Sequence, residues 1–86
     1  MNSTDRTRLL RLALLKELKA CGTHACPEAA LINAMYAQVN PPPDKPEILD
    51  ALEWLETENF IVSLNDSLGG GKRYRITTNG AAAIHA

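Results

Sequence analysis

The order of apolar patterns along the chain restricts its fold more than any other feature. Three stretches with helical spacing come first, and two short β-rich runs follow them. Three amphipathic helices and a hairpin can close around one core, whereas an isolated hairpin would be only marginally stable. With 86 residues, the chain is long enough for one such core and too short for two. The sequence therefore predicts a single domain, 1–86, that is mainly α-helical with a small β-hairpin.

The first two helices are predicted from three- and four-residue spacing. The first spans 5–21 and ends before Gly22, because glycine readily takes the left-handed conformation that follows many helices. Its apolar face carries Leu10, Ala13, Leu14, Leu18 and Cys21. The second helix has Pro27 in its first turn and stops at the prolines 41–43. Its predicted buried face is made of Leu31, Ile32, Met35, Tyr36 and Val39.

The third helix carries the clearest signals and is predicted from 44 to about 58. Asp44 and Glu47 form a capping-box-like pair at its start. Its apolar side carries Ile48, Leu52 and Leu55. The spacing therefore predicts a helix with one side in the core.

The β-rich runs 60–64 and 74–77 predict a hairpin with a long tip. The tip contains Gly69-Gly70-Gly71 and the basic pair Lys72-Arg73. Residues 81–84 predict a short terminal helix with Thr77 or Thr78 near its start.

This order of elements resembles the winged helix-turn-helix superfamily, in particular small bacterial regulators. Residues 48–61 are similar to the third helix and first wing strand of such domains, and residues 74–80 (Tyr-Arg-Ile-Thr-Thr-Asn-Gly) to the end of the second wing strand. The resemblance covers residues 5–84. It implies a three-helix core, a two-stranded wing and a short C-terminal helix. One departure is that the strand expected between helices one and two, near His24 and Ala25, is barely visible.

Charge is unevenly distributed, although the formal net charge is only −1. Residues 1–20 hold five basic and two acidic side chains, residues 44–58 hold one basic and six acidic, and residues 60–77 hold three basic and one acidic. Carboxylates oppose each approach to a phosphate backbone, so the third helix is a poor candidate to lie against DNA. The side of this helix opposite the core is predicted to carry Glu47, Asp50, Trp54 and Glu58.

Two functions are compatible with this distribution. The first is a DNA-binding transcription regulator, which the resemblance implies. In the family, helix three enters the major groove. Because helix three is acidic here, the charge distribution instead predicts contacts through the wing and helix one, with Lys72, Arg73 and Arg75 assisted by Arg6, Arg8 and Arg11. The alternative is a protein-interaction adaptor that uses the acidic third helix, with Trp54, Glu47, Asp50 and Glu58 as its contacts. A solvated hairpin turn and a half-buried Trp54 remain the simpler explanations of the same residues.

Leu12 and Leu15 lie outside the main apolar face of the first helix. Either the terminal helix near Ile84 covers them, or a second copy of the chain does. Small winged-helix regulators commonly dimerise through terminal helices, so the resemblance implies a homodimer with Leu12 and Leu15 in its interface.

Several other classes are not expected. Cys21, His24 and Cys26 superficially resemble a metal clip, but a structural zinc site needs four ligands and the only other histidine is His85. No nucleophile, base or carboxylate pair is arranged for catalysis, so the chain is predicted to be neither an enzyme nor a cofactor carrier. The sequence shows no signal-peptide pattern and no apolar run of about 18 residues, which predicts a cytoplasmic location.

Overall fold

The computed structural model describes residues 3–22, 24–65 and 71–84, which form four helices and a three-stranded antiparallel sheet. The elements are α1 (Ser3–Cys21), β1 (Cys26–Pro27), α2 (Glu28–Gln38), α3 (Lys45–Thr57), β2 (Ile61–Asn65), β3 (Lys72–Ile76) and α4 (Thr78–Ile84). Gly69 and Gly70 of the predicted hairpin tip lie outside the described residues, as does His85. The prediction of a mainly helical chain with a small hairpin is confirmed, with one strand added.

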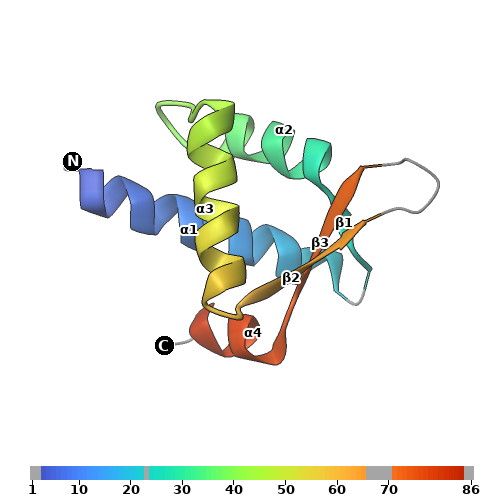
Figure 1. Cartoon of the computed structure of the whole chain (residues 1–86). Helices are drawn as coiled ribbons and strands as arrows, with labels where there is room; N and C mark the ends of the chain where they lie inside the picture. Colours follow the sequence, from blue (N-terminus) through green and yellow to red (C-terminus); the bar gives the residue numbers. More distant parts are fainter. Residues whose placement is uncertain (1–2, 23, 66–70, 85–86) are drawn as a thin grey trace.

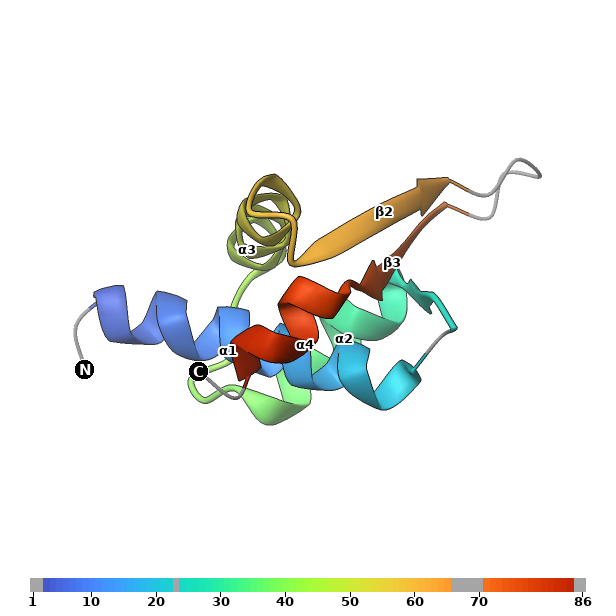
Figure 2. The same ribbon diagram turned by 90° about the horizontal axis from the view of Figure 1, so that it is seen from below.

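Helix α1 lies at the centre of the arrangement, because it packs against α2, α3, α4 and β3. Figure 1 shows α3 crossing in front of α1, with α4 close to the C-terminal end of α3. In Figure 1 and Figure 2 the hairpin extends away from the N-terminal end of α1, so these two parts lie at opposite ends of a molecule that is 41 Å long.

The core draws on all three long helices and on the sheet, as the spacing predicts. Its fully buried side chains are Leu10, Leu14, Leu18, Leu31, Met35, Ile48, Leu52, Leu55 and Ile61. The predicted burial of Tyr36 is wrong, since 42% of this residue is exposed. Helix α2 buries only the narrow stripe of Leu31 and Met35, and Tyr36 lies about 100° further round the helix.

The helix ends follow local chemistry. Gly22 has a φ of +66°, the left-handed conformation expected after α1. Asp44 caps α3 by accepting a hydrogen bond from the Glu47 amide at 2.9 Å. The prediction that Pro27 lies in the first turn of the second helix is wrong by one residue. Pro27 has an extended ψ of 144°, belongs to β1 and directly precedes α2.

The sheet has the order β1-β3-β2, so β3 is the central strand. Tyr74 pairs with Cys26 on one side and with Ser63 on the other. The pairing continues to Asn65 and Lys72, which corrects the prediction that Lys72 and Arg73 lie in the tip. Lysine has a low intrinsic preference for strands, but pairing with β2 holds Lys72 in an extended conformation here.

Thr77 joins the sheet to α4. Its amide donates to the carbonyl of Phe60 at 3.0 Å, and its hydroxyl accepts from the amide of Gly80 at 3.1 Å. This cap starts α4 at Thr78, which confirms the prediction of a short terminal helix with Thr77 or Thr78 near its start. Gly80 packs directly against the Phe60 carbonyl, where a side chain would collide with backbone.

Candidate functional site

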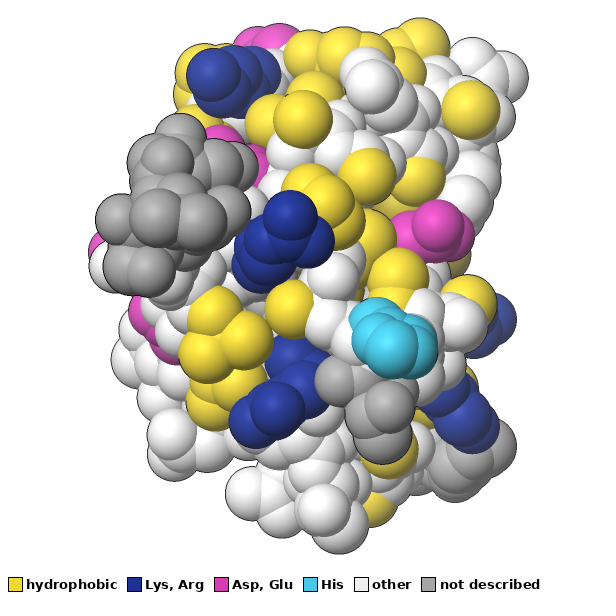
Figure 3. Space-filling model, turned by 90° about the vertical axis from the view of Figure 1, so that its right-hand side faces the viewer, with side chains coloured by type: hydrophobic (Ala, Val, Ile, Leu, Met, Phe, Trp, Pro, Cys, Tyr) yellow, Lys and Arg dark blue, Asp and Glu magenta, His cyan; other side chains and the backbone are white. Residues whose placement is uncertain are grey.

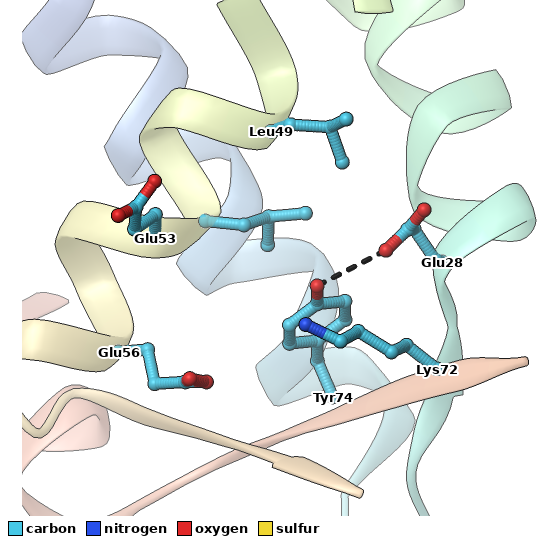
Figure 4. A pocket seen from close by; sticks show the side chains of 7 residues that line it. Glu28, Leu49, Glu53, Glu56, Lys72 and Tyr74 are labelled. Atoms are coloured by element: carbon cyan, nitrogen blue, oxygen red, sulfur yellow. Dashed lines mark hydrogen bonds between the residues drawn. The ribbon is translucent and has the colours of Figure 1, made fainter. Parts of the chain in front are cut away.

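A groove of about 590 Å³ lies between the start of α2, one face of α3 and the inner face of β3. Its lining combines carboxylates with an apolar floor: Glu28, Glu53, Glu56, Leu49, Leu52, Lys72 and Tyr74. Figure 4 shows Glu56 on α3 with its carboxylate turned toward the side of Tyr74 and Glu28, whereas the carboxylate of Glu53, also on α3, points away from them. We call this feature the acidic groove.

Helix geometry brings the α3 residues of the groove together. Leu49, Leu52, Glu53 and Glu56 follow the i, i+3, i+4, i+7 spacing of a single helix face. Leu52 is 1% exposed and belongs to the core, whereas Leu49 is half-buried. The floor is therefore apolar and rigid, and the carboxylates stand at the rim.

Tyr74 holds the opposite wall in place. Its hydroxyl donates to Oε2 of Glu28 at 3.1 Å and so ties β3 to the first turn of α2. Burial raises the pKa of Tyr74 to about 12, and the bond to Glu28 adds to this effect. The phenol therefore stays neutral and keeps donating, which positions the Glu28 carboxylate at the groove.

Alternation along β3 separates its basic residues. Lys72 shares the inner face with the buried Tyr74, whereas Arg73 and Arg75 lie on the outer face. Three carboxylates and one ammonium give the groove lining a charge of −2. A hollow lined mostly by one sign of charge concentrates ions of the opposite sign, so this site favours cations.

The outer face of the sheet is mixed basic and apolar. Arg73 is paired in register with Leu64, and Arg75 with Val62. Both arginines are exposed, and 41% of Leu64 is exposed. Figure 3, which views the molecule from the side of the sheet, shows Lys and Arg side chains lying among hydrophobic ones.

The basic residues predicted on helix one differ in their surroundings, and Arg6 is already engaged in an ion pair. Both Nε and Nη2 of Arg6 donate to the carboxylate of Glu47, at 2.8 and 3.2 Å. The guanidinium of Arg11 lies 3.8 Å from the centre of the Trp54 ring, and Arg8 is exposed. These residues occupy the N-terminal half of α1, far from the hairpin (Figures 1 and 2). The structure does not gather the predicted DNA contacts on one surface.

The residues predicted for a protein partner are also divided. Trp54 is 36% exposed and packs at 5.9 Å between ring centres against Phe60, under the cation of Arg11. Glu47 is held by Arg6, which leaves Asp50 and Glu58 as exposed acidic side chains. Trp54 is thus half-covered by its own chain.

Leu12 and Leu15 lie beside the terminal helix. A cavity at this place is lined by both leucines and by Ala83 and Ile84 of α4. Leu15 is only 5% exposed and belongs to the core, which corrects its assignment to a dimer interface. Leu12 keeps partial exposure.

The cysteines behave as packing residues. Cys26 is 6% exposed, and its burial, assisted by the neighbouring Cys21 thiol, raises its pKa to about 12. His24 is exposed. Within residues 3–22, 24–65 and 71–84, no three His, Cys, Asp or Glu side chains lie so that they could hold a metal ion.

Sequence reasoning missed Glu28, Glu53 and Glu56 as a site. The spacing of two leucines and two glutamates on one face of α3 was the available signal, but the wall formed by Glu28 depends on tertiary contacts.

Comparison with protein families gives no matching family model, and no curated protein is significantly similar to the chain. None of the described helices is long and apolar enough to cross a membrane.

Proposed function

We propose that the chain is a single winged-helix domain. Three features support this assignment: the order α1-β1-α2-α3-β2-β3, the central place of β3 in the sheet, and the short helix after it. The strand between α1 and α2 that such a domain requires is present as Cys26–Pro27. One hydrophobic core includes residues of α1, α2, α3 and the sheet, which supports one domain.

We further propose that this domain is a non-catalytic adaptor, and that its acidic groove binds a basic segment of a partner protein. The observation that carries the proposal is the placement of three carboxylates around a floor of Leu49 and Leu52. A lysine or arginine has a long apolar stem and a charged head, so its stem suits the leucine floor. Its head would then lie within reach of Glu53 and Glu56, and charge-assisted hydrogen bonds would hold it.

This arrangement differs from the adaptor surface predicted from the sequence. Glu47 and Trp54 already have partners within the chain, Arg6 and Arg11 respectively. We therefore place the proposed partner-binding site on a different face of α3, the one that carries Glu53 and Glu56.

Binding of duplex DNA is the second candidate, favoured by the exposed Arg73 and Arg75 on the outer face of the sheet. Two arginines supply only a small part of the phosphate contacts of a typical DNA-binding domain. The exposed acidic residues of α3 would be repelled by a duplex lying against both α3 and the sheet. The geometry therefore supports the adaptor more strongly.

The test compares a fluorescein-labelled peptide of alternating Arg, Lys and Leu with a mixed-sequence DNA duplex, using fluorescence anisotropy at low salt. The Glu53→Gln/Glu56→Gln variant should bind the peptide roughly tenfold more weakly, as expected for two partly exposed ion pairs. The matched control, Asp50→Asn/Glu58→Gln, removes the same charge from an exposed position of α3 and from the exposed residue that follows it, and should bind like the wild type. Equal losses of peptide affinity in both variants would refute binding of the peptide at the acidic groove.

The DNA arm decides the second candidate. Nucleic-acid binding through the sheet would be established by two results. The duplex must raise its anisotropy with an affinity that falls as salt rises, and the Arg73→Gln/Arg75→Gln variant must show both a lower affinity and a weaker salt dependence. If the duplex binds and the peptide does not, the adaptor proposal is rejected.

A further inference from the structure

A second cavity, separate from the acidic groove, lies between α1, the C-terminal part of α3 and α4. Its volume is about 280 Å³. Two arginines from α1, Arg8 and Arg11, form one side, and the rest of the lining includes Leu12, Leu15, Phe60 and Ile84. Arg8 and Arg11 are three residues apart and so share one helix face. We call this feature the arginine cavity.

The two arginines lack the partner that Arg6 has. Among the described residues, Arg6 is paired with Glu47, whereas neither Arg8 nor Arg11 has an ion pair. The Nε of Arg11 is buried and has no hydrogen-bond partner in the described part of the chain. Its guanidinium rests on the Trp54 ring, which fixes the cation without neutralising it.

An apolar cavity with two uncompensated cations at one side suits an anion with an apolar body. At a volume of roughly 30 Å³ per water-sized group, the cavity has room for about nine non-hydrogen atoms. A carboxylate is the anion that guanidinium groups bind with the best-matched geometry.

We propose that the arginine cavity binds a small carboxylic acid with an apolar body of about six carbons. Its carboxylate pairs with Arg8 and Arg11, and its apolar body packs against Leu12, Leu15 and Ile84. The ligand contacts α1 and α4 together, so it strengthens the attachment of the terminal helix. This inference does not depend on the proposed adaptor function, because no residue of the acidic groove takes part.

Trp54 provides a direct readout, since it lines the arginine cavity and is the single tryptophan of the chain. Titration with sodium hexanoate should change its emission with a Kd of about 1 mM. Hexan-1-ol has a similar apolar body and no charge, and it should bind at least about tenfold more weakly.

Variants separate specific binding from a general effect of the additive. Arg8→Gln should weaken hexanoate binding about tenfold, and it should fold normally because Arg8 is exposed. Arg75→Gln removes the same charge from the sheet and should leave the affinity unchanged. Backbone amide shifts caused by hexanoate should centre on α1 and α4. Equal affinity for acid and alcohol, an unchanged affinity in Arg8→Gln, or shifts centred elsewhere would overturn the proposal.

Discussion

Replacing Gly80 by alanine tests how closely α4 packs on the sheet. A Cβ at this position would collide with the carbonyl oxygen of Phe60 and lie 2.8 Å from Cγ1 of Ile76. The same oxygen accepts the hydrogen bond from the Thr77 amide at 3.0 Å. Backbone cannot yield like the end of a flexible side chain, so the start of α4 must move and the Thr77 junction must weaken.

Two effects of opposite sign determine the size of the change. Overpacking of a close contact costs about 1–3 kcal/mol. Alanine stabilises a helix interior over glycine by up to about 1 kcal/mol. The free energy of unfolding should therefore fall by about 1–2 kcal/mol, which lowers the Tm by roughly 4–16 °C in a domain of this size.

Thermal and urea unfolding followed by circular dichroism measure this loss. Asn79→Ala is the matched control, because Asn79 is exposed in the same helix and its change brings the propensity gain without the collision. The control should be as stable as the wild type or slightly more stable. If the Gly80→Ala variant had the same free energy of unfolding as the control, α4 could not approach the Phe60 carbonyl as closely as described.

Three further predictions follow from burial. In a Tyr36→Phe background, tyrosinate absorbance should report a pKa of about 12 for Tyr74, mainly because the phenol is buried. The Glu28→Gln substitution should lower this pKa, and a pKa near 10 in the unsubstituted site would contradict the buried environment. Because this pKa lies above that of the unfolded chain, its stabilising contribution is complete below about pH 10 and disappears as the pH rises through about 12. Cys26, in a variant without the other cysteine, should react with a thiol reagent much more slowly when folded than in urea, and equal rates would argue against its burial. Leu52→Ala should reduce the free energy of unfolding by about 2–5 kcal/mol in urea denaturation, and a loss well under 1 kcal/mol would indicate a loose core.

Local signals predicted the helices well. The cap at Asp44 and the spacing of Ile48, Leu52 and Leu55 are both contained within α3, and the structure places them as expected. The left-handed Gly22 is equally local. Such features depend on neighbouring residues alone, so the sequence suffices to find them.

Features that depend on distant residues were missed or misplaced. Strand β1 has two residues and exists because it pairs with β3, which lies more than 40 residues later. The pairing of Arg6 with Glu47 spans 41 residues, and it engages two predicted contact residues with each other. Neither effect leaves a periodic pattern in the sequence.

The acidic groove illustrates both cases. Glu53 and Glu56 share a helix face with Leu49, which the sequence reveals through spacing. The opposite wall requires the hydrogen bond between Tyr74 and Glu28, which are 46 residues apart. The negative charge of α3 can be counted in the sequence. Which face of α3 lines a groove depends on where β3 and α2 pack against it, and the sequence does not show this.

The central claim, that the groove accepts basic side chains, is tested most directly by nuclear magnetic resonance. An ¹⁵N-labelled sample is titrated with the Arg-Lys-Leu peptide, and the amide shifts are mapped on the chain. We predict saturable shifts centred on Glu28, Leu49, Glu53 and Glu56, with little change at Asp50. Saturable shifts centred outside the groove, or none at all, would contradict it.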